Sequence, residues 1–192
     1  MITWLVIIFC YLLGSIPTAY VAGRIVKGKD IRELGDRNMG AQNAFRELSP
    51  TAGMVVGIVD VSKGVLAILI ARALGLTLPA TLTAGAATVI GHNWPVFVGF
   101  RGGRGESTTI GILLVMVTMP MLIAGGPAAI VLLLKKNVIL ASAVLFIALP
   151  LVGWWLRVPP LLIFYGIALP ILVALTHLLR VRRATVRHAD IN

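Results

Sequence analysis

Long apolar stretches, separated by short polar segments, are the feature that most restricts how this chain can fold. Seven such runs lie at about residues 2–23, 53–75, 77–99, 107–123, 124–134, 138–156 and 160–179. A helix needs about 20 mostly apolar residues to cross a bilayer core, range about 17–25. With 58% hydrophobic and 12% charged residues, the chain lacks the polar surface of an ordinary soluble domain. We therefore predict an all-α integral membrane protein with about seven transmembrane helices, forming one domain over residues 1–192.

The region from Pro120 to Pro127 decides the number of spans. Met119-Pro120 and Gly125-Gly126-Pro127 can form a tight hairpin between two spans or a kink within one. We predict the hairpin, with spans over 107–123 and 124–134. For the first run we predict a retained helix; a cleaved signal peptide is the alternative.

The distribution of basic residues predicts the orientation, because Lys and Arg concentrate in short cytoplasmic loops. With seven spans, the segments 24–52, 99–106, 135–137 and 180–192 share one side. They hold six, two, two and four basic residues, which is fourteen of the chain's seventeen. Merging the two spans near Pro120 would place Lys135 and Lys136 on the opposite side. We therefore expect the N-terminus outside and the C-terminus in the cytoplasm.

The net charge of +10 does not indicate nucleic-acid binding, because the aromatic residues lie inside apolar runs and not among the Lys and Arg residues. The three histidines are far apart, and the single cysteine, Cys10, cannot complete a ligand set, so we predict no metal site. We find no Ser-His-Asp or Cys-His pattern of a covalent nucleophile. The oligomeric state is not indicated.

The polar segment 35–46 is the first candidate for chemistry. It reads Gly-Asp-Arg-Asn-Met-Gly-Ala-Gln-Asn-Ala-Phe-Arg and is dense in glycine, amide and guanidinium groups. Glycine lets the backbone approach an anion, amides contact hydroxyl or phosphate oxygens, and Arg offers a planar fork for phosphate. A solvated loop is the alternative interpretation.

The second candidate, Asp60-Val61-Ser62-Lys63-Gly64, lies inside an apolar run. In a helix Asp60 and Lys63 share a face at i and i+3, together with small residues that permit close helix packing. Ionisable residues at membrane depth are costly, so they are functional candidates. The alternative is a structural ion pair near the interface.

The third candidate is the segment 91–109, where an apolar run leads into Arg-Gly-Gly-Arg-Gly. Glycine-rich backbone binds anions, and a helix starting near Glu106 would direct its N-terminal amides to the same place. We predict a phosphate cradle here. It lacks the ending of a nucleotide P-loop, so we do not infer ATP or GTP. A flexible basic turn is the alternative.

Together with Tyr11–Pro17 and Ala141-Ser142, these segments resemble the bacterial acyl-phosphate:glycerol-3-phosphate acyltransferases over nearly the whole chain. The resemblance implies seven transmembrane helices in the bacterial inner membrane, with the active face in the cytoplasm. It also implies transfer of a fatty acyl group from acyl phosphate to the 1-hydroxyl of glycerol 3-phosphate, giving lysophosphatidic acid and phosphate. Acyl phosphate, glycerol 3-phosphate and membrane lipid are the expected partners. An acyl phosphate is already activated, so no cofactor is expected.

The site is expected from residues that match the family's motifs or stand beside them. The expected catalytic residues are Lys63, Arg104, Asn38, Ser142 and His92, with His92 as a helper. The expected substrate contacts are Gly40, Asn43, Arg46, Arg101, Gly102, Gly103, Gly105, Thr108, Asp36, Arg37 and Arg180.

Several positions depart from the family pattern. Asp36 and Arg37 replace a serine and a glycine, and we expect Arg37 to offset the Asp36 carboxylate by pairing with it. Arg101 and Arg104 stand where Lys is usual. The remaining departures are Glu106, Ser107, Ile139 and Arg180. They leave two alternatives open: a non-catalytic or altered-substrate paralogue that binds anionic lipid or regulates a true acyltransferase, and a small-solute transporter.

Overall fold

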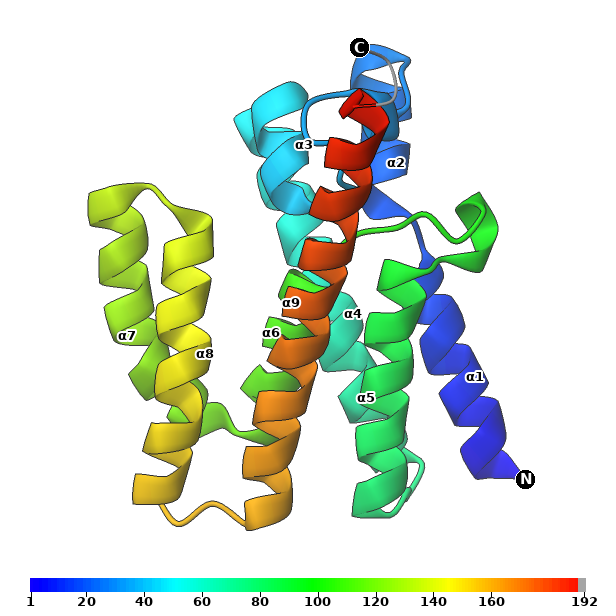
Figure 1. Ribbon diagram of the computed structural model, residues 1–192. Coiled ribbons are helices and arrows are strands. Elements are labelled where there is room, and N and C mark those ends of the chain that lie inside the picture. Colours follow the sequence, from blue (N-terminus) through cyan, green and yellow to red (C-terminus); the bar gives the residue numbers. More distant parts are fainter. Residues whose placement is uncertain (190–192) are drawn as a thin grey trace.

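The computed structural model describes the backbone of residues 1–189 and the side chains of residues 1–179. This part of the chain consists of helices and connecting loops and contains no strand (Figure 1). The α-helices are α1 (Ile2–Ser15), α2 (Thr18–Lys27), α3 (Ala41–Glu47), α4 (Pro50–Ala73), α5 (Leu78–Asn93), α6 (Glu106–Met116), α7 (Thr118–Lys135), α8 (Val138–Trp155) and α9 (Pro160–Ala189). Two short 3-10 helices, η1 (Ile31–Glu33) and η2 (Val96–Val98), lie in the loops.

Five helical segments are long and apolar enough to cross a membrane. They are Ile2–Lys27, Pro50–Ala73, Thr118–Lys135, Val138–Trp155 and Pro160–Leu179. Helices α5 and α6 are shorter, with 16 and 11 residues. Large apolar side chains such as Leu133 and Trp154 are exposed, as expected for surfaces that face lipid. The all-helical membrane class is confirmed, whereas the count of seven spans stays a prediction.

The hairpin predicted between Pro120 and Pro127 is wrong. The break lies at Val117, where the backbone leaves the helical region with φ −137° and ψ 58°. Pro120 is in the first turn of α7, where the missing N–H of proline removes no helical hydrogen bond. Pro127 and the two glycines before it lie inside α7. The region still forms two helices, α6 and α7. The chain therefore returns by Lys135 to the end that carries the segment 24–52, as the distribution of basic residues predicts.

The polar segments gather at one end of the helix bundle. Figure 1 shows the N-terminus at the lower end, with the α4–α5 and α8–α9 connections. The upper end carries α2, α3, the α7–α8 connection and the end of α9. The basic segments 24–52 and 135–137 therefore lie at the same end of the molecule.

Helices α1 and α5 touch through glycines on both sides. An added Cβ on Gly14 would lie 2.1 Å from the carbonyl oxygen of Thr88, and one on Gly91 would lie 2.1 Å from that of Tyr11. Backbone-to-backbone approach of this kind is possible only where a side chain is absent. The contact fixes the end of α5, which carries His92 and Asn93.

Helices α4 and α6 meet in the same way. An added Cβ on Gly64 would lie 2.2 Å from the carbonyl oxygen of Thr108, and one on Gly111 would lie 2.0 Å from that of Val61. The start of α6 is thereby held against the part of α4 that carries Lys63.

We predict that Gly111→Ala destabilises the protein by about 1–3 kcal/mol, because the new methyl group forces the two helices apart. Gly125→Ala is the matched control, since no atom lies within 4 Å of its added Cβ. Thermal unfolding of the purified proteins in detergent compares the two. Equal unfolding temperatures for the two variants would contradict the packing argument.

Candidate active site

A buried ion pair joins Asp60 and Lys63 on α4. The Lys63 Nζ lies 2.7 Å from Asp60 Oδ1, and the two side chains are only 3% and 2% exposed. Removing either partner would leave an uncompensated buried charge, which is strongly destabilising. The prediction that the two residues share a helix face is confirmed.

The ammonium group of Lys63 also closes the break between α1 and α2. It donates to the carbonyl oxygen of Ile16 at 2.6 Å and to Thr18 Oγ1 at 2.6 Å. Thr18 in turn donates to Asp60 Oδ1 at 3.0 Å. With the bond to Asp60, all three N–H donors of Lys63 are used inside the protein.

His92, at the end of α5, lies beside this pair. Its Nδ1 atom is 3.7 Å from Asp60 Oδ1, and its side chain is 8% exposed. The imidazole is therefore oriented by a carboxylate on one side. On its other side it meets the glycine-rich loop.

The glycine-rich loop folds back onto the end of α5. The Gly102 N–H donates to the carbonyl oxygen of Asn93 at 3.2 Å, and the Gly103 N–H donates to that of His92 at 3.0 Å. An added Cβ on Gly103 would lie 2.0 Å from His92 Nε2. These two amides hold the loop to α5, so in this structure they are not the phosphate cradle that the sequence predicts.

Gly105 starts α6 in the left-handed region, with φ +82° and close to Asn93. On the first turns of α6, Glu106 contacts the Ser142 hydroxyl of α8. The Thr108 hydroxyl is fully buried and has no hydrogen-bond partner among the described residues. The start of α6 therefore offers a buried hydroxyl next to the glycine-rich loop.

Arg104 links this loop to the segment 35–46. One of its terminal nitrogens donates to Asp36 Oδ2 at 3.1 Å, and the side chain is 15% exposed. Its Nε is buried without a partner in the described part of the chain. One donor of the guanidinium thus stays available for a ligand.

Asn43 holds the segment 35–46 in shape. Its amide donates to the carbonyl oxygens of Ile31, Leu34 and Asn38 at 3.4, 3.0 and 3.0 Å. Its own oxygen accepts the Asp36 N–H at 3.3 Å. Asn43 is buried and organises the loop from within.

Asn38 and Gly40 form the buried edge of the same loop. The Asn38 Oδ1 is buried and has no partner among the residues described. An added Cβ on Gly40 would lie 2.7 Å from Asn38 Nδ2, so Gly40 leaves room for this amide. Asn38 therefore presents a free acceptor at the site.

Asp36 pairs with two arginines, but not with Arg37. Its Oδ2 lies 3.1 Å from Arg104 and 3.7 Å from Arg46. Arg37 is exposed, at φ +59°, and its side chain has no ion-pair partner in the described structure. The expected Asp36–Arg37 pair is therefore wrong. The backbone turns at Arg37 into the left-handed region, and the carboxylate is instead reached by Arg104 from the glycine-rich loop.

Two of the expected contacts, Arg101 and Arg180, remain. Arg101 is exposed on the loop before Gly102. Arg180 is on α9, but its side chain lies outside the described residues. Within the described residues, no group of three or more His, Cys, Asp or Glu side chains could hold a metal ion.

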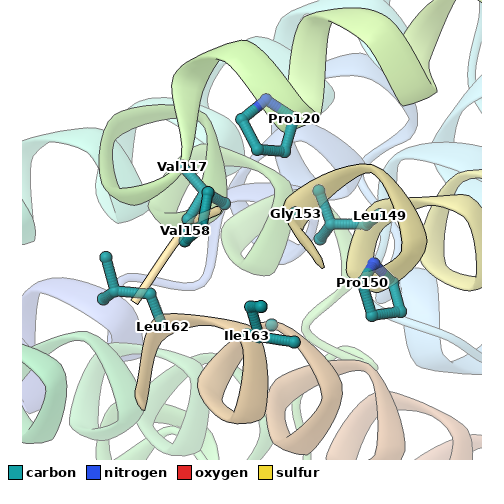
Figure 2. A pocket seen from close by; sticks show the side chains of 9 residues that line it. Val117, Pro120, Leu149, Pro150, Gly153, Val158, Leu162 and Ile163 are labelled. Carbon is teal, nitrogen blue, oxygen red and sulfur yellow. The ribbon is translucent and has the colours of Figure 1, made fainter. Parts of the chain in front are cut away.

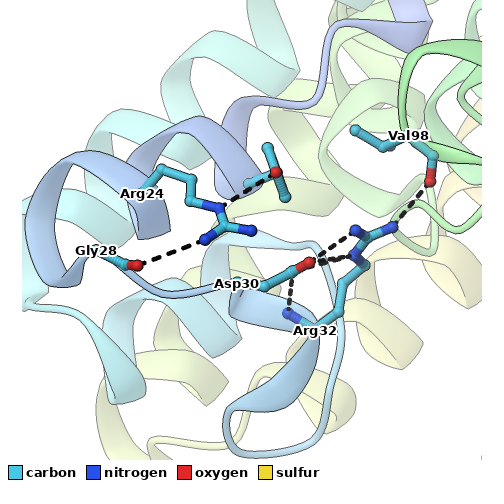
Figure 3. Close-up of polar contacts among 6 residues, drawn as sticks. Arg24, Gly28, Asp30, Arg32 and Val98 are labelled. Carbon is cyan, nitrogen blue, oxygen red and sulfur yellow. Dashed lines mark hydrogen bonds and ion pairs between the residues drawn. The ribbon is translucent and has the colours of Figure 1, made fainter.

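Sequence reasoning missed a link between the two loops, made by Arg32 (Figure 3). Arg32 donates to both oxygens of Asp30, with a shortest distance of 2.7 Å, and to the carbonyl oxygen of Val98 at 2.8 Å. The hydrogen bond from Arg32 holds the pKa of the Asp30 carboxyl below its usual range, although partial burial opposes the shift. Alternating basic and acidic residues around Asp30 were the only signal in the sequence.

The small apolar pocket in Figure 2 lies elsewhere. Residues of α7, α8 and α9 and the connections beside them line it, among them Val117, Leu149 and Leu162. It contains no charged group, so it offers nothing to bind a phosphate.

A continuous series of contacts therefore joins the predicted segments. It runs from the Lys63–Asp60 pair through His92 and the glycine-rich loop to Arg104. From Arg104 it continues through Asp36 to the loop that Asn43 organises. Buried polar atoms that have no partner among the described residues lie on the segments of this series, among them Asn38 Oδ1, Arg104 Nε and Thr108 Oγ1.

Comparison with known proteins assigns the class. A family model described as glycerol-3-phosphate acyltransferase matches residues 4–187. Glycerol-3-phosphate acyltransferase 4 of Dehalococcoides mccartyi is 49% identical over 93% of this chain and 97% of its own length. A glycerol-3-phosphate acyltransferase of Chlorobaculum tepidum is 40% identical over 79% of this chain and 71% of its own.

Solved structures agree with the sequence relatives. The crystal structure of PlsY, an integral membrane glycerol 3-phosphate acyltransferase, in its glycerol 3-phosphate form has a TM-score of 0.85 and 32% identity, and the match covers 97% of this chain and 93% of that chain. Its lysophosphatidic acid form has a TM-score of 0.79. The protein is thus a multi-pass membrane enzyme that transfers acyl groups. It belongs to the glycerol-3-phosphate acyltransferase family.

We predict that Gly103→Val reduces turnover at least tenfold, because the side chain would displace the His92 ring and break the contact between the loop and α5. Gly126→Val is the control, since its added Cβ meets no atom within 4 Å. Initial rates of both proteins, measured beside their membrane insertion, make the test. Full activity of the Gly103 variant would remove this loop from the site.

We predict that Asp30→Asn lowers stability at neutral pH by about 1 kcal/mol, since Arg32 loses its charged acceptor. Because the folded-state pKa of Asp30 is lowered, this contribution is present above its ordinary value of 3.8 and is lost as the pH falls through the folded value. Unfolding temperatures of wild type and variant should converge once the pH falls below the folded-state pKa of Asp30. A difference that persists in acid would show that the carboxylate charge is not its cause.

Proposed function

We propose that this protein transfers a fatty acyl group from acyl phosphate to the 1-hydroxyl of glycerol 3-phosphate, giving lysophosphatidic acid and inorganic phosphate. The observation that carries the proposal is the meeting of Arg104, Arg46 and Asn38 at the end of the molecule where the polar segments gather. The family's printed substrate and the two crystallised forms of PlsY support the acceptor and the product. The acyl phosphate donor rests on the sequence resemblance and on the chemistry below.

The reaction needs no covalent enzyme intermediate. The hydroxyl oxygen of the acceptor attacks the carbonyl carbon of the acyl phosphate and forms the ester bond. The bond between that carbon and the phosphate oxygen breaks, and the departing phosphate takes the proton of the hydroxyl. Orientation and stabilisation of the developing charge supply most of the acceleration in such a site.

The residues take different roles in this scheme. Arg104, with its free Nε, and Arg46, which is half exposed, bind phosphate groups. The free oxygen of Asn38 accepts from the attacking hydroxyl and orients it. Thr108 offers its buried hydroxyl to the same ligands, and the exposed Arg101 adds a cation to the glycine-rich loop.

Other residues act by holding these groups in place. Lys63 has no donor left for a phosphate, so it is a positioning residue that holds the break between α1 and α2 directly and His92 through Asp60. Asn43 positions the loop of Asn38. Ser142 fastens α8 to the start of α6 through Glu106. His92 is placed to assist through its ring edge next to Gly103.

In this proposal the protein crosses the bacterial inner membrane seven times, with its N-terminus outside. The end that carries the site faces the cytoplasm. Fourteen of the seventeen basic residues support this orientation. Both substrates are anionic, and glycerol 3-phosphate is water-soluble, so a basic site at that surface suits them. The acyl chain is then held among the apolar helices.

In the decisive assay, the purified protein in lipid, supplied with acyl phosphate and glycerol 3-phosphate, should release phosphate and form lysophosphatidic acid in equal amounts. Arg46→Gln should raise the KM for glycerol 3-phosphate about tenfold or more, because a charged hydrogen bond is lost. Arg157→Gln, an exposed arginine remote from the site, is the control. Absence of turnover over several chain lengths would overturn the proposal.

Cysteine labelling tests the topology. We expect Lys29→Cys and Lys136→Cys to react only from the cytoplasm and Thr77→Cys only from outside, since all three positions are exposed. Labelling of Lys136→Cys from outside would contradict the predicted arrangement, in which an odd number of spans lies between the external N-terminus and Lys136.

A further inference from the structure

The Asp36 carboxylate makes contacts of the kind that phosphate groups make in proteins. Its Oδ2 lies 3.1 Å from Arg104 and 3.7 Å from Arg46. Its Oδ1 accepts the N–H of Asn38 at 3.2 Å. Two guanidinium groups and a backbone amide are the donors that commonly bind phosphate oxygens in proteins.

The loop holds this carboxylate in place. The Asp36 N–H donates to the buried oxygen of Asn43 at 3.3 Å, which fixes the backbone of the aspartate. Gly35 and Arg37 on either side adopt φ +54° and φ +59°, so the chain turns sharply around it. The Asp36 side chain remains 31% exposed and can be reached from solvent.

We propose that Asp36 is an internal counter-anion that competes with the phosphate groups of substrate and product for Arg104 and Arg46, and so sets a low affinity of the site for phosphate. This rests on the proposed function, in which the two arginines bind phosphate groups. An incoming phosphate must displace the carboxylate from at least one arginine or share the guanidinium with it. A departing phosphate is replaced at once by the carboxylate, which favours release of the product.

The effect is local and not a matter of net charge. Glu33 is an exposed acid three residues earlier and has no ion pair with either arginine. Glu33→Gln therefore removes the same charge from the same segment without freeing Arg104 or Arg46. Asp36→Asn keeps an acceptor for the Asn38 N–H, so the loop retains its turn while the charge is lost.

The experiment compares wild type, Asp36→Asn and Glu33→Gln in detergent. Inorganic phosphate is titrated while thermal unfolding is followed, which reports binding without turnover. We expect Asp36→Asn to bind phosphate about two- to fivefold more tightly than wild type, the range of a partly exposed ion pair. Its KM for glycerol 3-phosphate should fall, and inhibition by phosphate should strengthen, by a similar factor. Glu33→Gln should match wild type.

An Arg46→Gln background supplies the second test. There the gain from Asp36→Asn should shrink, because one of the two contested cations is gone. Unchanged or weaker phosphate binding in Asp36→Asn, an equal gain in Glu33→Gln, or no phosphate protection in any protein would overturn the inference. Phosphate protection that tightens in Asp36→Asn without acyl transfer would uphold it and reject the proposed function alone.

Discussion

The buried pair of Lys63 and Asp60 is the interaction on which the rest of the site depends. Two charges inside the helix bundle are tolerated only if every donor and acceptor finds a partner. Lys63 meets this condition by reaching the carbonyl oxygen at the end of α1 and the first hydroxyl of α2. The Lys63 ammonium group on α4 therefore fixes the break between α1 and α2. Asp60 extends the same set of contacts to His92 on α5.

Close backbone contacts between the helices also determine where the loops of the site lie. The glycines between α1 and α5 and between α4 and α6 bring the helix axes near enough for main-chain atoms to touch. The end of α5 then presents two carbonyl oxygens to the N–H groups of Gly102 and Gly103. The glycine-rich loop is thus shaped by helix packing, and Arg104 emerges from it toward Asp36. Arg32 adds a second connection between the two loops, through Val98.

Much of the fold could be predicted from the sequence, because apolar length and basic loops report directly on the membrane. The error at Pro120 has a physical cause: proline ends a helix in its interior but is accommodated in the first turn, and periodicity alone does not distinguish the two. The segments of the site were also predictable by residue type. Their partners were not, because Lys63 binds a main-chain carbonyl 47 positions away and Asp36 binds an arginine 68 positions away. The sequence predicts an ion pair of Asp36 with its neighbour Arg37, and only the geometry of the turn shows that this pair does not form.

The acidic departures from the family pattern now have a structural explanation. Asp36 lies between two arginines, and Glu106 meets the Ser142 hydroxyl, so neither carboxylate stands unpaired in the site. Both carboxylates therefore add contacts between segments of the site that are far apart in the sequence. In the role proposed above, Arg46 and Arg104 bind phosphate groups, and the fixed Asp36 carboxylate moderates their affinity. An enzyme whose proposed substrates and products all carry phosphate gains from such moderation, because a site that binds inorganic phosphate tightly would be slow to release it.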